Sequence, residues 1–195
     1  HAARILFWEK RATGIEYLRG GTRESAHARC EVVLAAGAFN SPQLMQLSGL
    51  GPASHLQALG IPIVADMPGV GANLQDHYNG RLVYECVGAC TLNDVVASPL
   101  RKVREGLRYL LTRKGFLTLG ASSATGFIAT DGAARPDVQI GLILYSTEKI
   151  GSTLHPFSGF SVLVRLLRPE SRRTVMIKST DPLEPPAMRP NYLAT

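Results

Sequence analysis

Two adjacent residues, Asp76 and His77, combine a carboxylate with an imidazole, side chains that often act as general acid and base in enzymes. Consecutive side chains of an extended chain point to opposite sides, so we do not expect these two groups to contact each other. The interpretation we favour is a hydrogen bond that anchors the surrounding loop, with His77 lining a cavity. His155 stands in a loop rich in Gly and Ser without a partner nearby in the sequence, and is interpreted as a surface or turn residue.

The sequence lacks the residue spacings that a metal site or a catalytic nucleophile requires. The histidines are scattered, and no His-x-x-x-His or Cys-x-x-Cys pair could hold a metal ion, so no metal site is expected. Cys30, Cys86 and Cys90 are expected to be reduced, buried thiols. Ser122 and Ser123 lack the Gly-x-Ser-x-Gly environment of a hydrolase nucleophile.

Small residues are the better candidates for a ligand site. Gly49-Leu50-Gly51 and Gly69-Val70-Gly71 each begin a Gly-x-Gly-x-x-Gly pattern, but neither completes it or joins a strand to a helix. Ala35-Ala36-Gly37-Ala38 does follow an apolar run, and side chains no larger than methyl would let a nucleotide approach the main chain. Close packing of a helix on a strand requires the same residue types, so both interpretations stay open.

The apolar pattern predicts the elements that would position these residues. Cys30 to Ala35 contains a continuous apolar run, which is typical of a strand covered on both faces in a parallel sheet. Ser41-Pro42 would then begin a helix that ends near Leu47, and Gly60 would close a second helix in the left-handed conformation. That second helix is predicted over residues 53–59, and two earlier strands over residues 3–8 and 12–18.

The pattern changes near Asp76, where we place a domain boundary between residues 1–76 and 77–195. After it, strands separated by hairpin-like turns accompany an amphipathic helix capped by Ser98-Pro99, which predicts an antiparallel sheet with a helix packed on one face. The predicted strands cover residues 81–87, 125–130, 138–145, 160–167 and 174–178. The predicted fold class is therefore α/β plus α+β. Both ends of the chain are typical of cuts through a longer polypeptide.

Composition and charge limit the kinds of protein that the chain can be. With 45% apolar and 18% charged residues the chain is typical of a globular protein, and no stretch reaches the roughly 20 apolar residues of a membrane-spanning helix. The formal charge is +6, and its densest basic run, Arg101 to Lys114, lies on the predicted amphipathic helix. We interpret that run as a solvated face and expect no nucleic-acid partner. We expect a cytoplasmic location, with membrane association of the full-length protein left open.

Several segments resemble, in the right order, the glucose-methanol-choline (GMC) family of flavoprotein oxidoreductases, and in particular its choline-dehydrogenase-like branch. The segment SPQLMQLSGLGP is similar to the second signature of that family. The other matching segments are ATGIEYLRGG, EVVLAAGAFNSPQL, GIPIVADMPGVGANLQDH and LLRPESRRTVMIKSTDPLEPPAMRPNYL. Arg173 is one departure, because relatives often have Gly at this turn.

The resemblance implies part of a doubly wound FAD-binding domain, residues 1–76, joined to an incomplete substrate-binding domain on an antiparallel sheet, residues 77–195. It implies FAD as the cofactor, and oxidation of a small primary alcohol, choline-like or alkyl or aryl, to an aldehyde by hydride transfer to the flavin. The electron acceptor is not identified. The cofactor-binding residues that it implies are Ala36, Gly37, Asn73, Asp76 and His77.

The same resemblance implies which parts of the site lie elsewhere. The FAD-binding glycine fingerprint is expected before His1, and the catalytic histidine is expected beyond Thr195. No catalytic residue is therefore assigned within the chain, and the isolated fragment is expected to be inactive.

Two other classes remain open from sequence. A non-enzymatic module could bind nucleic acid or another acidic partner through the Arg101 to Lys114 run, and an α+β domain without a ligand would have the same pattern. A homo-oligomer is a further expectation, because strand edges left unpaired in the first 75 or so residues favour association.

Overall fold

The computed structural model describes residues 1–120, 122–149, 151–189 and 191–192 of the chain. The chain divides into two compact units, of which the first contains residues 1–76 and the segment from Glu170 onward, and the second contains His77–Pro169. The first unit is interrupted after Asp76. The assignment of the segment from Glu170 to the second domain is wrong, because this segment returns to pack in the first unit. The predicted domain end, residues 193–195, lies outside the described residues.

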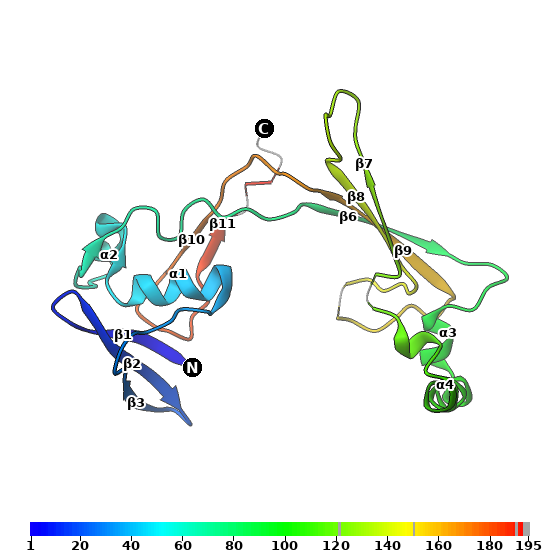
Figure 1. Cartoon of the computed structure of the whole chain (residues 1–195), viewed down its shortest axis with the longest axis horizontal. Coiled ribbons are helices and arrows are strands. Elements are labelled where there is room, and N and C mark those ends of the chain that lie inside the picture. The colour runs from blue at the N-terminus through cyan, green and yellow to red at the C-terminus, as the bar shows by residue number, and fades with distance from the viewer. Residues whose placement is uncertain (121, 150, 190, 193–195) are drawn as a thin grey trace. The chain divides into compact units, whose positions relative to one another are not determined.

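The first unit opens with an antiparallel sheet in the order β1-β2-β3 (Figure 1). Its strands are β1 (Ala2–Trp8), β2 (Arg11–Arg19) and β3 (Thr22–His27). Sequence reasoning missed β3 because the run TRESAH has neither apolar alternation nor β-branched enrichment. Cross-strand ion pairs help to fix its register, since Glu16 on β2 accepts from Arg4 on β1 at 3.1 Å and from Arg23 on β3 at 2.5 Å.

The predicted strand over Cys30 to Ala35 is wrong. This stretch belongs to no helix or strand, and Val33 is 75% exposed. A strand exists only where a neighbour accepts and donates its ladder hydrogen bonds, and no described residue pairs with this run. The helix that follows, α1 (Gly37–Leu47), also begins earlier than predicted, so Pro42 lies inside it. Ser41 is not its cap; the Ser41 hydroxyl accepts from the Ala36 N–H at 3.1 Å.

Short elements complete the first unit. Helix α2 (Ala53–Ala58) ends as predicted, because Gly60 has a φ of +72° and the N–H groups of Gly60 and Ile61 bond to the carbonyls of Gln57 and Leu56 at 3.0 Å each. Leu56 and Ile61 then pack with Ile177 as the buried apolar cluster. The remaining strands are the parallel pair β4 (Leu50–Gly51) and β5 (Ala65–Asp66), and the antiparallel pair β10 (Thr174–Met176) and β11 (Ala187–Arg189).

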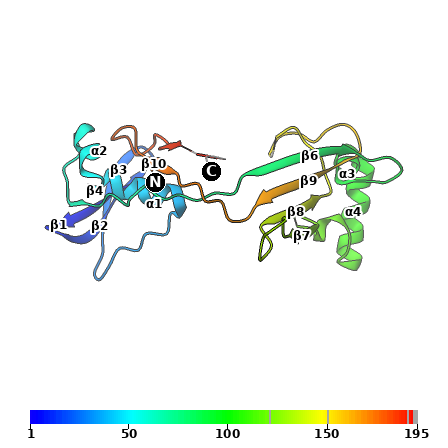
Figure 2. The ribbon, with the colours of Figure 1, turned by 90° about the horizontal axis from the view of Figure 1, so that it is seen from above.

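The second unit is built on the predicted antiparallel sheet, with strand order β6-β9-β8-β7 (Figure 2). Its strands are β6 (Asn79–Glu85), β7 (Ala124–Ile128), β8 (Val138–Ile143) and β9 (Gly159–Leu166). Each lies within two residues of a predicted strand at both ends. The predicted strand at residues 174–178 corresponds to β10, which is not part of this sheet, so no hairpin joins β9 to β10.

The helices of the second unit are α3 (Leu92–Ala97) and α4 (Pro99–Thr112), followed by the 3-10 turn η1 (Phe116–Thr118). Ser98 caps α4 as predicted, accepting from the Arg101 N–H at 3.4 Å. The expected packing of this helix on one sheet face is wrong, because α4 contacts α3 and η1. Figure 1 shows both helices at one end of the sheet. Within the described residues, no helix is both long and apolar enough to cross a membrane.

Helix α3, which sequence reasoning missed, depends on a capping box. Asp94 accepts from the Thr91 N–H at 2.7 Å and the Thr91 hydroxyl at 3.1 Å, and from the Ser158 hydroxyl at 2.6 Å. The Ser158 bond is the largest of the causes that hold the pKa of Asp94 below its ordinary value. This carboxylate therefore ties the start of α3 to the segment that leads into β9.

We expect Asp94→Asn to flatten the acid side of the stability profile. Because the folded-state pKa of Asp94 is lowered, its stabilising contribution is present above the unfolded-state pKa, about 3.9, and is lost as the pH falls through the folded value. The variant should lose about 1 kcal/mol at neutral pH and less as the pH falls toward 3. Thermal unfolding followed by circular dichroism checks this. Asp131→Asn, in an exposed turn, is the matched control. The prediction would be contradicted if the stability of Asp94→Asn fell with decreasing pH as steeply as that of the wild type.

Candidate functional site

The small-residue corner, Ala35 to Ala38, lies at the start of α1. Ala36 is the N-cap residue and offers no side-chain acceptor to the first turn, and Gly37 follows with a φ of +82°. A Cβ added to Gly37 would meet no atom within 4 Å. Both residues are exposed. The main chain is therefore open to a ligand at the point where the helix begins, and no side chain of a described residue fills the space beside Gly37.

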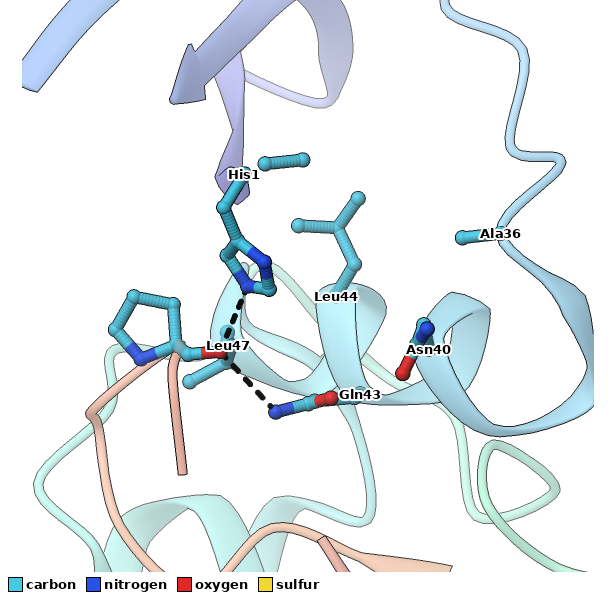
Figure 3. A pocket seen from close by; sticks show the side chains of 8 residues that line it. His1, Ala36, Asn40, Gln43, Leu44 and Leu47 are labelled. Carbon is cyan, nitrogen blue, oxygen red and sulfur yellow. Dashed lines mark hydrogen bonds between the residues drawn. The ribbon is translucent and has the colours of Figure 1, made fainter. Parts of the chain in front are cut away.

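A cavity of about 140 Å³ adjoins this corner (Figure 3). Pro182 closes one side of it, because its carbonyl lies 2.8 Å from His1 Nε2 and accepts from Gln43 Nε2 at 3.4 Å. Gln43 also donates to the Glu184 carbonyl at 2.8 Å. The lining residues are His1, Ala2, Ala36, Asn40, Gln43, Leu44, Leu47 and Pro182. Ala36 is thus a predicted site residue that lines this cavity, whereas Gly37 does not line it.

The second part of the candidate site is the segment from Gly69 to Asp76. Leu74 forms an antiparallel bridge with Arg173, with N–H to carbonyl distances of 3.1 and 3.0 Å. Asn73, just before the bridge, is exposed and has a φ of +58°, a left-handed conformation that Asn tolerates better than most residues. The bridge to the segment beyond Glu170 therefore holds the predicted loop in place.

Asp76 and His77 make separate hydrogen bonds, as the sequence interpretation required. The Asp76 carboxylate accepts from the Tyr192 hydroxyl at 2.5 Å, and this bond raises the pKa of the Tyr192 phenol. His77 Nδ1 lies 2.6 Å from the Leu166 carbonyl within the second unit. Because a carbonyl can only accept, Nδ1 carries the proton, and in the neutral ring Nε2 keeps its lone pair. His77 is exposed and anchors the start of β6 to the end of β9.

No hydrogen bond between described residues joins the corner at Ala36 and Gly37 to Asn73, Asp76 or His77. Each part is positioned by its own contacts. The described residues also contain no group of three His, Cys, Asp or Glu side chains that could hold a metal ion. The three cysteines are free, but the prediction that they are buried is wrong for Cys30 and Cys90, which are exposed.

Sequence reasoning also misjudged two residues. Arg173 was noted as a departure only, yet its side chain is 2% exposed, and its guanidinium carbon lies 3.3 Å from the centroid of the Tyr192 ring. None of its three side-chain nitrogens has a hydrogen-bond acceptor among the described residues. His155, expected at the surface, is half-buried and stacks on Phe157 with ring centroids 4.8 Å apart. Its Nε2 lies 3.7 Å from a Glu148 carboxylate oxygen.

Comparison with known proteins places these features in a family. The family model described as GMC oxidoreductase matches residues 1–79. An oxygen-dependent choline dehydrogenase of Burkholderia vietnamiensis is 42% identical over 197 aligned residues, which cover 99% of this chain and 34% of that protein. A second such protein, from Burkholderia ambifaria, is 43% identical with the same coverage. The chain therefore spans about a third of the length of these curated relatives.

Solved structures share the fold. A formate oxidase of Aspergillus oryzae RIB40 aligns with a TM-score of 0.86 at 22% identity, covering 100% of this chain and 39% of that one. A pyridoxine 4-oxidase of Mesorbium loti aligns with a TM-score of 0.74 at 25% identity, covering 100% of this chain and 34% of that one. The predicted mixture of α/β and antiparallel α+β structure is thereby confirmed. The chain belongs to the GMC oxidoreductase family, on its choline-dehydrogenase-like branch.

Proposed function

We propose that the full-length protein carrying this chain is an FAD-dependent oxidoreductase that oxidises a primary alcohol, choline-like or alkyl or aryl, to an aldehyde. The relatives named above are choline dehydrogenases, which supports this substrate class. The observation that carries the proposal is the open corner at Ala36 and Gly37, with its adjoining cavity. FAD, when bound, supplies the hydride acceptor.

The residues of the first unit fit a dinucleotide. Methyl and hydrogen side chains at Ala36 and Gly37 leave the main chain accessible, and the uncapped N–H groups of α1 favour an anionic group such as a phosphate. We propose that these residues contact the ADP end of FAD. Asn73, Asp76 and His77 would border the flavin, where the Tyr192 and Leu166 hydrogen bonds restrict the movement of Asp76 and His77. On this proposal the second unit supplies walls of the substrate cavity.

The test is the flavin content of the purified full-length protein. We expect a yellow protein that converts primary alcohols to aldehydes, and we expect Ala36→Trp, which fills the cavity, to weaken FAD binding. Overpacking of about 1 to 3 kcal/mol corresponds to an affinity loss of about 5- to 150-fold. Ala58→Trp, at an exposed alanine of α2, is the control and should keep its flavin. A colourless wild-type protein that FAD cannot reconstitute would overturn the proposal.

A further inference from the structure

One face of the sheet in the second unit carries an arginine between two amides. Asn79 on β6, Arg165 on β9 and Gln139 on β8 are direct cross-strand neighbours. Directly opposed residues of paired strands point to the same face, so the three side chains form a row across the sheet. Arg165 Nε donates to Asn79 Oδ1 at 2.5 Å, and its Nη1 donates to Gln139 Oε1 at 3.4 Å. The amides therefore hold the guanidinium in place.

The charge of Arg165 has no counter-ion among the described residues. Both of its hydrogen-bond partners are neutral, and no ion pair in the described part of the chain includes it. No described contact uses Nη2. A guanidinium has five N–H donors arranged to pair with a carboxylate through two parallel bonds. Arg165 thus keeps free the donors that recognise an anion.

Arg165 also lines a small pocket of about 70 Å³ on this face. Two hydroxyls share its wall, since Ser122 Oγ and Thr125 Oγ1 lie 3.3 Å apart. Gly141 leaves the space open, because a Cβ there would come within 3.3 Å of Ser122 Oγ. The lining residues are Ser122, Thr125, Gln139, Gly141, Leu163 and Arg165, none of them acidic. The pocket holds one positive charge and two hydroxyl groups beside apolar atoms, and it is large enough for a group of a few heavy atoms.

Asp137, which precedes β8, is a candidate counter-ion from the same side of the sheet, but its carboxylate is already engaged. Asp137 Oδ1 accepts from the Thr130 N–H at 2.8 Å and Oδ2 accepts from the Thr130 hydroxyl at 2.5 Å. These bonds, together with the charge of Arg168, lower the pKa of Asp137. Asp137 therefore remains ionised and held at the β7–β8 turn, and it does not neutralise Arg165.

We propose that Arg165 forms a carboxylate-binding subsite, and that the alcohol oxidised by the full-length protein carries a carboxylate group. The proposal rests on the proposed alcohol oxidation and narrows its substrate class. A carboxylate matches both the free guanidinium donors and the size of the pocket. Choline bears a quaternary ammonium group, which Arg165 would repel and for which the pocket offers no carboxylate. On this proposal the protein prefers an alcohol that carries a carboxylate over choline.

The test compares ω-hydroxycarboxylates of increasing chain length with their primary amides and with choline, using the full-length protein loaded with FAD. For at least one chain length we expect kcat/KM for the acid to exceed that for the amide about 10- to 100-fold, which is the usual size of charge-assisted hydrogen bonds. Arg165→Gln should abolish this ratio and Arg165→Lys should keep part of it. Arg104→Gln removes one charge from an exposed position of the same unit and should leave the ratio unchanged.

Binding of simple anions distinguishes a subsite for a substrate carboxylate from a contact with a phosphate of the cofactor. We expect acetate to bind the wild-type protein and not Arg165→Gln, as measured by calorimetry, and inorganic phosphate to bind neither. Phosphate binding that requires Arg165, without acetate binding, would indicate contact with a phosphate of the cofactor and would overturn the subsite. A preference for choline or the amides over every acid would also overturn it while leaving alcohol oxidation intact. If a flavin-loaded protein oxidised no alcohol, the function would fail, and the acetate titration would still decide the subsite.

Discussion

Gly71→Ala is expected to lower the free energy of unfolding by about 2 to 4 kcal/mol, because it combines left-handed strain with overpacking. Gly71 has a φ of +81°, and an added Cβ would lie 2.2 Å from the Val175 carbonyl oxygen and 2.5 Å from Gln46 Nε2. The close approach is itself structural, since the Val175 N–H donates to the Gly71 carbonyl at 2.7 Å. The added methyl group must therefore push the two backbones apart.

Gly69 provides the matched control two residues earlier. Its φ is not positive, and a Cβ there would meet no atom within 4 Å. Gly69→Ala should therefore unfold within about 0.5 kcal/mol of wild type, as surface substitutions usually do. Denaturant unfolding of both variants measures the difference. Equal midpoints for Gly71→Ala and Gly69→Ala would show that the contact between this segment and β10 is not tight.

Local chemistry was enough to predict several elements from sequence. The Ser98-Pro99 cap and the left-handed Gly60 depend on residues close to one another in the chain, and the four strands of the second unit have a local apolar pattern that marks them. In each case the signal has a direct physical cause, such as a hydroxyl that accepts an N–H or a glycine that adopts a positive φ. The two caps need no distant partner, whereas the strands also find partners far along the chain, such as Asn79 of β6 opposite Arg165 of β9.

Pairing partners decide the elements that sequence misjudged. The run before Ala35 has the composition of a buried strand, but hydrophobicity alone cannot supply the neighbouring backbone that a strand requires. Without that neighbour the run forms no strand and Val33 is exposed, while the following helix extends back to Gly37. Pro42 then lies in the helix interior, where proline removes a backbone hydrogen-bond donor. The pair Ser41-Pro42 alone instead suggests the start of a helix.

The candidate site also contains some features that local sequence could predict and others that depend on distant partners. Ala36 and Gly37 were found from residue size, and the structure places them at an open corner. The return of the segment from Glu170 to the first unit, which brings Arg173 against Leu74, could not be read from spacing because the two are separated by the whole second unit. The amide row around Arg165 was missed for a related reason. Its members lie on three strands and meet only through the strand register.

A buried amide links α1 to the segment from Glu170 onward, and its replacement is expected to have a large effect on the free energy of unfolding. Gln46 of α1 is fully buried, and its side chain behaves like the peptide group of a neighbouring strand. Its Nε2 donates to the Val175 carbonyl at 2.9 Å, and its Oε1 accepts from the Ile177 N–H at 3.0 Å. Gln46→Glu keeps the shape but removes the donor and introduces a charge into this enclosed position.

We expect Gln46→Glu to lower the free energy of unfolding by about 3 kcal/mol or more at neutral pH, through loss of one bond and burial of a charge. Burial raises the folded-state pKa of an introduced carboxyl above its unfolded value. The penalty should therefore be small in acid, where the protonated group can donate, and should grow as the pH rises from about 4.3 to the folded value.

Denaturant unfolding at a series of pH values measures this dependence, with Gln57→Glu on the exposed side of α2 as the control. The control should follow the wild-type profile, because its carboxylate remains in water. A penalty for Gln46→Glu that does not change with pH would mean that the introduced group reaches solvent. In that case the amide would not be the enclosed link between α1 and β10, and the returning segment would be held by the Leu74 bridge and the β10–β11 pairing instead.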